Sequence, residues 1–370
     1  MKQVAIIGGG LGGLIAAIRL AGAGVPVMLF EKKTYPFHRV CGEYVSNETL
    51  PFLKHNGLFP EKFKPPSISR FQLSAANGQS TFLPLDLGGF GISRYTFDHF
   101  LSQQARAAGV QLFEQCEVTD VHFDTNRFKI HTSEKVYEAD VALGSFGKRS
   151  RLDIQLNRDF IKKRSPYVGI KHHIKTDHPD DLIALHNFNG GYLGISNIEA
   201  GKTNMCYLVH RSLLKRYGAI PALEKHVLFR NPHIRHIYAN ATFLFEKPEV
   251  INEVSFAPKE PVYNHMLMVG DAAGMITPLC GNGMAMAIHA AKLAADLVLQ
   301  QIAEKQSRLW LEKNYDTAWK KIFEGRLRYG RRVQHYLFGS PLRSNLAVQL
   351  AIHLRPVARL LIKQSHGEPF

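Results

Sequence analysis

A glycine-rich turn near the N-terminus constrains the fold more than any other feature of this 370-residue chain. Residues 3–7 read QVAII, an apolar run typical of a buried parallel strand, and the residues from Leu14 onward have a helical pattern. Between them, Gly8, Gly10 and Gly13 have the spacing G-x-G-x-x-G. In that spacing the first glycine allows a tight turn, the second lets backbone approach a pyrophosphate, and the third lets the helix pack closely on the strand.

The helix that follows would point its N-terminus, with free N–H groups and a partial positive charge, at the phosphates. A second strand, residues 26–30, ends at Glu31, which stands 18 residues after Gly13. A carboxylate at that place hydrogen-bonds the ribose hydroxyls of an adenosine group. This order of elements favours a dinucleotide site over a glycine-rich turn without a ligand, but it does not separate NAD from FAD.

A second motif lies far along the chain, where residues 266–289 read MLMVGDAAGMITPLCGNGMAMAIH. An apolar strand ends at a Gly-Asp pair, a glycine loop follows, and a long helix is predicted from Met284 to about residue 301. This stretch resembles the GD motif of FAD-dependent hydroxylases and their relatives, whose aspartate binds the ribityl and pyrophosphate region. The resemblance implies that Asp271 contacts FAD, and that Gly283 and Met284 contact it through their backbone. A helix N-terminus there would stabilise the negative charge of reduced flavin.

The segment between the two motifs holds further positions that match the family. Residues 91–109 predict a helix with Thr96 as its N-cap and Gly109 as its C-terminal stop. Arg94 takes the place of an arginine or glutamine that contacts the flavin in the resembled family; the alternative is a solvated loop arginine. Val118 falls where the family's backbone contacts the adenine.

The hydroxylases also have an Asp-Gly pair tied to both FAD and NAD(P)H. Here the aspartate position is Phe146, followed by Gly147, and Lys148, Arg149 and Arg151 come directly after it. This basic cluster either grips an anionic cofactor or forms a solvated turn. NAD(P)H is the expected reductant, with a separate reductase as the alternative because the usual motif is incomplete.

The loop at residues 35–46, YPFHRVCGEYVS, resembles the corresponding loop of geranylgeranyl reductases and flavin halogenases. In the reductases this loop lies beside the isoalloxazine, and its cysteine has been proposed as catalytic. The resemblance implies that Arg39, Cys41 and Gly42 lie at the flavin. A cysteine beside Arg39 and His38 has a lowered pKa if it is exposed, and a buried structural Cys41 is the equal alternative.

Residues 154–260 contain alternating runs that predict antiparallel strands roofing the flavin. Tyr192 and Asn204 resemble, faintly, a substrate-binding strand motif of the prenyl reductases, in which a tryptophan stands where this chain has Gly194. A glycine within a strand often marks close approach of another group. Tyr192, Gly194 and Asn204 are therefore predicted substrate contacts, in a pocket of altered shape. The Trp-x-Trp-x-Ile-Pro motif of halogenases is missing.

The histidines predict no metal site. His172 and His173 point to opposite faces of a strand, which predicts one core and one surface residue. His233 and His236 are spaced i, i+3 without a third ligand nearby.

Charge is concentrated at the C-terminal end. The chain has 46 Lys and Arg against 31 Asp and Glu, a net charge of +15, and residues 301–370 contribute 13 against 5. Such a balance fits nucleic acid, an anionic membrane or an anionic ligand as partner. Residues 308–338 predict helix, and residues 345–362 are apolar nearly all round, broken at Pro356. That segment is buried, caps an apolar tunnel or touches a membrane, and burial is favoured.

The cysteine content and the hydropathy of the chain indicate the cellular compartment in which the protein is expected. The four cysteines form no CxxC pair, which favours a reducing cytoplasm. The apolar stretch at residues 4–30 is interrupted by Arg19 and has no basic segment before it, so it predicts neither a membrane span nor a signal peptide. A cytoplasmic protein is expected, with peripheral membrane or carrier-protein contact through the basic C-terminus as an open alternative.

These patterns predict an α/β fold, α+β overall: a Rossmann-like FAD-binding domain with a parallel sheet, an antiparallel β-sheet substrate domain and a helical C-terminus. The FAD-binding domain is predicted to be discontinuous. It comprises residues 1–60, 90–152 and 262–303; the substrate domain comprises 61–89 and 153–261; the helical region comprises 304–370. The predicted cofactor contacts are Gly8, Gly10, Gly12, Gly13, Glu31, Lys32, Arg39, Cys41, Gly42, Arg94, Val118, Asp271, Gly283 and Met284.

The chain thus resembles the FAD-dependent oxidoreductases that comprise aromatic hydroxylases, geranylgeranyl reductases and flavin halogenases. The resemblance implies first a monooxygenase that hydroxylates or epoxidises a hydrophobic small molecule through a flavin hydroperoxide. The alternative is a reductase of carbon–carbon double bonds in a prenyl or polyketide chain, with Cys41 as a candidate proton donor. A third hypothesis is a basic flavoprotein without turnover that binds membrane or nucleic acid, but the sequence has no nucleic-acid-binding motif.

Overall fold

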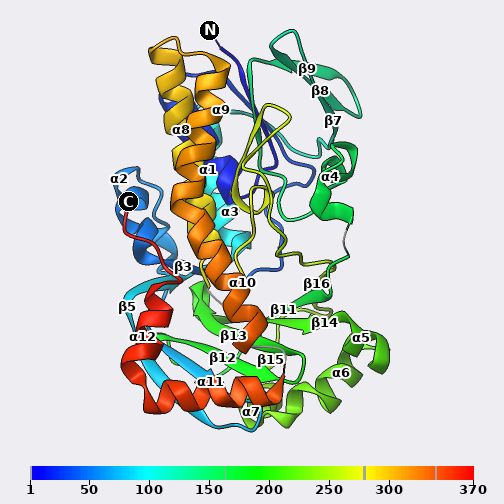
Figure 1. Ribbon diagram of the computed structural model, residues 1–370, viewed down its shortest axis with the longest axis vertical. Helices are drawn as coiled ribbons and strands as arrows, with labels where there is room; N and C mark the ends of the chain where they lie inside the picture. The colour runs from blue at the N-terminus through cyan, green and yellow to red at the C-terminus, as the bar shows by residue number, and fades with distance from the viewer. Residues whose placement is uncertain (1, 163, 278–280, 338–339) are drawn as a thin grey trace.

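The computed structural model of the protein describes residues 2–162, 164–277, 281–337 and 340–370. The molecule is elongated, with a large, mostly antiparallel sheet in the lower half of Figure 1 and a mainly parallel sheet with its helices in the upper half. This architecture confirms the predicted fold class. The parallel sheet positions the cofactor motifs and the antiparallel sheet roofs them.

A six-stranded sheet contains the strands of both predicted FAD motifs. Its order is β17 (Val262–Tyr263), β18 (Met266–Met268), β10 (Val141–Gly144), β1 (Val4–Ile7), β2 (Val27–Phe30) and β6 (Gln111–Phe113). From β18 to β6 every pairing is parallel. All residues of β1, β2, β10 and β18 are buried, because helices and loops cover both faces of the sheet.

Three helices beside this sheet begin or end at the predicted glycines. They are α1 (Leu11–Gly22), α3 (Arg94–Ala107) and α8 (Gly283–Ala303), and α1 packs against both of the others. Gly109, with φ +86°, follows α3 as predicted. The prediction of Thr96 as N-cap is wrong: Ser93 has the extended backbone of an N-cap, and its Oγ accepts a hydrogen bond from the Thr96 N–H at 3.1 Å.

The second large sheet has nine strands. Its order is β15 (Thr242–Phe243), β11 (Tyr167–Lys175), β14 (Lys202–His210), β13 (Gly191–Ile198), β12 (Leu182–Phe188), β4 (Ser67–Ser74), β5 (Ser80–Gly91) and β3 (Tyr44–Ser46), with β16 (Glu249–Ile251) paired to β11. The three predicted antiparallel strands are β11, β13 and β14. β3 belongs to the predicted FAD-binding segment 1–60 but pairs here with β5, which joins the loop of Cys41 to this sheet. The domain boundaries themselves stay a prediction.

Smaller elements complete the fold. A three-stranded antiparallel sheet consists of β7 (Val118–Asp124), β8 (Arg127–Thr132) and β9 (Val136–Ala139). The short helices are α2 (Leu50–His55), α4 (Arg151–Gln155), α5 (Arg211–Tyr217), α6 (Ile220–His226) and α7 (Pro232–Asn240). Both His172 and His173 are buried, at 7% and 2% exposure, so the prediction of one surface histidine is wrong: α7 and the segment after it cover one face of β11, and the Cys41 loop covers the other.

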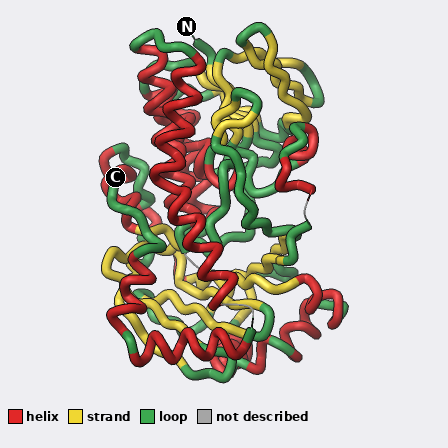
Figure 2. The backbone as a smooth tube through the Cα atoms, in the orientation of Figure 1, coloured by secondary structure: helices red, strands yellow, loops and turns green. Residues whose placement is uncertain are grey.

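The C-terminal helices run the length of the molecule (Figure 2). They are α9 (Arg308–Trp319), a π-helical turn at Lys320–Glu324, α10 (Gly325–Leu337), α11 (Pro341–His353) and α12 (Arg355–Lys363). α11 and α12 lie against β5 and β12 of the nine-stranded sheet. The prediction that the whole apolar segment 345–362 is buried is wrong for one face of the two helices. Only one side of each helix meets the sheet, and Leu346 and Leu360 on the other side are 67% and 55% exposed.

No helix within the described residues is both long and apolar enough to cross a membrane.

Candidate flavin site

The glycine turn between β1 and α1 leaves no room for side chains at most of its glycines. Gly8 has φ +104°, and a Cβ there would collide with the backbone oxygen of Ser145. A Cβ at Gly13 would collide with the backbone oxygen of Gly8, and one at Gly12 would come within 2.8 Å of Val269. At Gly10 the nearest described neighbour would be Arg94 Nη2, at 3.5 Å. Gly8 and Gly13 therefore hold the turn together, whereas Gly10 faces open space suited to a ligand.

Two helices direct N-termini without side-chain caps toward this region. Among the described residues, no side chain caps the N-terminus of α1 at Gly10 or that of α8 at Asn282, and neither first turn contains an acid. Asn282 is fully buried, and its Oδ1 has no hydrogen-bond partner among the described atoms. Free N–H groups at helix N-termini bind phosphate and other anionic groups. The residues present therefore fit a dinucleotide; α8 begins at Gly283, one residue before the predicted start at Met284.

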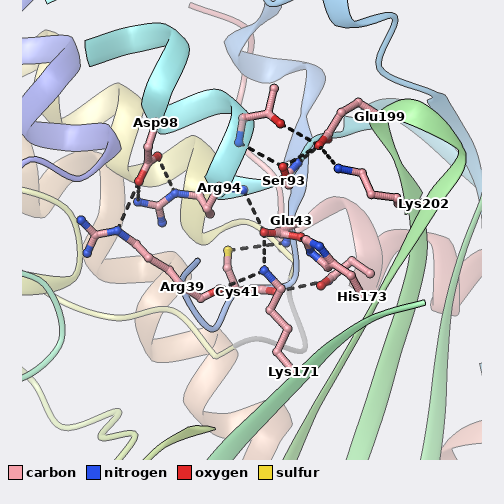
Figure 3. A network of polar contacts seen from close by, with 12 residues as sticks. Arg39, Cys41, Glu43, Ser93, Arg94, Asp98, Lys171, His173, Glu199 and Lys202 are labelled. Carbon is pink, nitrogen blue, oxygen red and sulfur yellow. Dashed lines mark hydrogen bonds and ion pairs between the residues drawn. The ribbon is translucent and has the colours of Figure 1, made fainter. Parts of the chain in front are cut away.

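Glu31 lies at the carboxyl end of β2, where the motif predicts it. It is 4% exposed, and its Oε2 accepts hydrogen bonds from the Gly9 N–H at 3.0 Å and from Arg39 Nη2 at 3.0 Å. Arg39 also pairs with Asp98 at 3.2 Å, and Asp98 in turn holds Arg94 Nε at 2.7 Å (Figure 3). Glu31, Arg39, Asp98 and Arg94 thus form one chain of alternating charges along the glycine turn. Arg94 is a member of this chain and not a solvated loop arginine.

The three basic residues predicted to cluster after Phe146 have three different environments. Arg151 is exposed, and Arg149 pairs with Glu253 at 2.8 Å. Lys148 is half-buried; burial lowers its pKa, and the nearby Asp271 opposes that shift. Only Lys148 is therefore placed to meet a cofactor from this cluster.

Lys259, which the sequence analysis did not single out, anchors the GD motif. It is 7% exposed, and its Nζ donates to the backbone oxygens of Asp271 and Lys148, each at 2.7 Å. Burial lowers the pKa of Lys259 to about 8, against the opposing effect of Asp271. The bonds tie the Gly270–Ala272 turn to the segment after β10, which brings both basic lysines to the aspartate.

A buried carboxylate organises the Cys41 loop. Glu43 is fully buried with φ +53°, and its Oε1 lies 2.5 Å from Lys171 Nζ and accepts from the Arg94 N–H at 2.8 Å. Its Oε2 lies 2.6 Å from His173 Nε2. Burial alone would raise the pKa of Glu43, but Lys171 and His173 outweigh it and hold the pKa at about 2. Figure 3 shows this carboxylate between the loop, α3 and β11.

The backbone of the same loop is fixed by side chains of the nine-stranded sheet. Lys171 Nζ donates to the Arg39 carbonyl at 3.0 Å, and Asn204 Nδ2 donates to the Cys41 carbonyl at 3.2 Å. The Sγ of Cys41 accepts a weak hydrogen bond from the Glu43 N–H at 3.5 Å. Cys41 is half-buried, so it is neither a core residue nor a freely exposed thiol.

The predicted substrate residues share one face of the sheet with these anchors. Across β13 and β14, Gly194 pairs with Cys206 and Ser196 pairs with Asn204, and residues directly opposite each other point to the same face. Cys206 is also opposite Lys171 in β11, and burial with the nearby Cys41 raises its pKa to about 12. A Cβ at Gly194 would have the Cys206 oxygen, 3.7 Å away, as its nearest described neighbour. The mid-strand glycine thus leaves space in front of the Cys41 loop.

The remaining predicted contacts differ in burial. Lys32 is exposed, and Gly42 is exposed on the loop, while Val118 is buried at the start of β7. Within the described ranges, no group of three or more His, Cys, Asp or Glu side chains is placed to hold a metal ion. The contacts that sequence reasoning missed are Glu43, Asp98, Lys171, His173 and Lys259.

The fold and the two motifs define a FAD-dependent oxidoreductase. Residues 1–164 match the family described as FAD binding domain. The chain is similar to flavoproteins of the geranylgeranyl reductase and flavin halogenase group, and its cofactor is FAD.

Similar proteins come from both branches. The chain is 25% identical over 349 residues to digeranylgeranylglycerophospholipid reductase 2 of Methanopyrus kandleri. The alignment covers 88% of this chain and 84% of the reductase. A geranylgeranyl bacteriochlorophyll reductase-like protein of Thermoplasma acidophilum superposes with a TM-score of 0.79 at 17% identity, covering 100% of this chain and 96% of the other. The myxobacterial chondrochloren halogenase CndH superposes with a TM-score of 0.74 at 20% identity, and the superposition covers 100% of this chain and 94% of the halogenase. At such identities the two solved structures show the fold alone.

Proposed function

We propose that this FAD-dependent oxidoreductase reduces carbon–carbon double bonds in an isoprenoid chain. The observation that carries the proposal is the half-buried thiol of Cys41, held between its own fixed loop and the space in front of Gly194. The relative from Methanopyrus is named as a reductase of a digeranylgeranyl lipid, which supports this substrate class.

Reduction of a double bond adds a hydride to one carbon and a proton to the other. Reduced FAD supplies the hydride when bound, and a nicotinamide or a separate reductase must restore the reduced form. In the proposal the proton leaves the Cys41 Sγ and is replaced from solvent, since the thiol is accessible in part. Asn204 and Lys171 hold the loop backbone so that the thiol keeps its position.

The buried wall on the sheet face of Gly194 is apolar. Tyr192 and Leu208 pack in an apolar cluster with Val254 and Met275, on the same sheet face as Gly194. An isoprenoid tail would bury its surface here without leaving polar groups unpaired. The position of Met275, four residues after Asp271, ties this apolar wall to the GD motif.

The experiment is turnover of photoreduced enzyme without oxygen, with geranylgeranyl lipids as substrates and mass spectrometry of the product. The proposal expects a gain of one H₂ per reduced double bond. The conservative variant C41S should lower kcat by about 10²–10⁴-fold, the usual contribution of a general acid, with FAD content unchanged. The matched control C116S changes another half-buried cysteine and should keep full activity. Full activity of C41S would remove the thiol from the mechanism.

A monooxygenase acting on a hydrophobic small molecule is the second candidate. The completely buried Glu43–Lys171 pair beside the Cys41 loop favours it, since oxygen activation by a flavin needs a site with little water. Product that forms only in the presence of oxygen, and is heavier by one oxygen atom, would decide for this alternative and against the reductase.

A further inference from the structure

The helices α11 and α12 have an inner and an outer face of different character. The inner face packs on the nine-stranded sheet through Val348, Ala351 and Ala358, which are 8% exposed or less. The two helices lie across the lower end of the molecule, with their outer side turned away from the rest of the chain (Figure 1). Packing against the sheet therefore accounts for only some of the apolar residues of α11 and α12.

The outer face carries a continuous apolar stripe. We call it the leucine stripe; its members and their exposed fractions are Leu342 83%, Leu346 67%, Leu350 36%, Leu354 51%, Val357 42% and Leu360 55%. Within α11 the four-residue spacing keeps Leu342, Leu346 and Leu350 on one side, and the exposed apolar residues continue through the bend at Leu354 into α12. Single exposed leucines are ordinary on a soluble protein, but a stripe of this length indicates an interaction surface.

The stripe is embedded in positive charge. Residues 325–363 contain eight Lys and Arg and no Asp or Glu. On the two helices, Arg343, Arg355, Arg359 and Lys363 are exposed beside the stripe, and Arg359 pairs with Asp86 at 2.7 Å. Apolar side chains flanked by cations fit the surface of a bilayer with acidic lipids, because the acyl chains are apolar and the headgroups over them are anionic. A second copy of this chain fits less well, because it would bring the same cations together.

We infer that α11 and α12 dock on the surface of an anionic lipid bilayer. The leucine stripe lies in the boundary between headgroups and acyl chains, and the flanking cations contact lipid phosphates. The docking stands independently of the reaction that the site performs. Its geometric consequence is that the sheet face of Tyr192, packed against the inner side of these helices, lies next to the membrane.

The direct test is co-sedimentation of the full FAD-loaded chain with vesicles. Vesicles of phosphatidylcholine with phosphatidylglycerol should bind the protein, and vesicles of phosphatidylcholine alone should bind it at least about tenfold more weakly. The double variant L342E/L346E should lose about tenfold or more in binding to the anionic vesicles, because it places carboxylates in the stripe. FAD content and the thermal unfolding midpoint of this variant show whether it is folded.

The chain offers a matched control. Leu309, on α9 at the other end of the molecule, is 73% exposed, so L309E makes the same chemical change outside the stripe and should bind as wild type does. Equal loss in L309E and L342E/L346E would overturn the proposal. No binding to anionic vesicles, equal binding to neutral ones, or a stable dimer that L342E/L346E dissociates while vesicles stay unbound would each overturn it as well.

Discussion

Lys171 of β11 and Glu43 of the Cys41 loop form an ion pair in which both side chains are completely buried. The two residues are 128 positions apart, and the contact joins the roof of the site to the loop that carries the candidate proton donor. His173 and the Arg94 N–H complete the coordination of the carboxylate, so that its charge is well compensated. Such a pair contributes to the position of a loop more than to net stability, since desolvation offsets much of its attraction.

Removal of one partner should be costly. The variant K171M leaves the Glu43 carboxylate buried without its ammonium, and we expect it to lower the free energy of unfolding by about 3–5 kcal/mol. The measurement is urea unfolding followed by circular dichroism.

The matched control is K175M, which changes the exposed lysine at the end of the same strand and should cost well under 1 kcal/mol. The double variant E43Q/K171M should recover part of the loss because no charge is then buried alone. Equal stabilities of K171M and wild type would show that the pair is absent in solution.

The same pair predicts a dependence of stability on pH. The pKa of Glu43 is held at about 2, below its ordinary value of 4.5. The unfolded chain therefore binds more protons than the folded chain between these values, and the contribution of Glu43 is fully present above pH 4.5 and is lost as the pH falls toward 2. The difference in unfolding free energy between wild type and E43Q should be constant from pH 5 to 7 and shrink below pH 4.5. A difference that stays constant down to the acid limit of the folded state would contradict this.

Substitutions at two glycines of the turn should affect different properties, stability at Gly13 and FAD binding at Gly10. A Cβ at Gly13 meets the backbone of Gly8, whereas Gly10 has φ −83° and space for a methyl group. We expect G13A to lower the thermal midpoint of the FAD-free protein. We expect G10A to leave that midpoint unchanged or slightly raised, and yet to weaken FAD binding, since the methyl group enters the space open to the pyrophosphate.

Fluorescence titration with FAD and thermal unfolding of the same samples provide both measurements. Wild-type FAD affinity in G10A would mean that the phosphates pass elsewhere.

Local patterns in the sequence predict the parts of the site that are local in the structure. The glycine turn, Glu31, Asp271 and the start of α8 each follow from spacing within one segment, because a strand–turn–helix unit fixes its own geometry. The Glu43 coordination does not, since Lys171 and His173 reach the loop only after nine strands have assembled. The sequence signal for this coordination is Lys171 itself, a lysine at a buried position of a strand, which indicates a buried partner of opposite charge.

The C-terminal segment shows a different limit. Residues 345–362 are apolar nearly all round, so the sequence does not say which side of the helices meets the sheet. That choice depends on the shape of β5 and β12, far away in the chain. The same reason explains why neither His172 nor His173 lies at the surface, since their strand is covered on both faces.

Replacing the side chain of Asp271 should weaken FAD binding without lowering the stability of the fold. It lies in the turn Gly270–Ala272, and the turn is held by bonds from Lys259 to the backbone oxygen of Asp271, which a side-chain substitution leaves in place. We expect D271A to keep the thermal midpoint of the FAD-free protein within a few degrees and to lose FAD during gel filtration, as read from the ratio of flavin to protein absorbance. The matched control is D316A on α9, which removes a carboxylate paired to Lys320 on the surface and should retain FAD fully. Full retention of FAD in D271A would show that its carboxylate does not contact the cofactor, because the backbone of the turn is the same in both proteins.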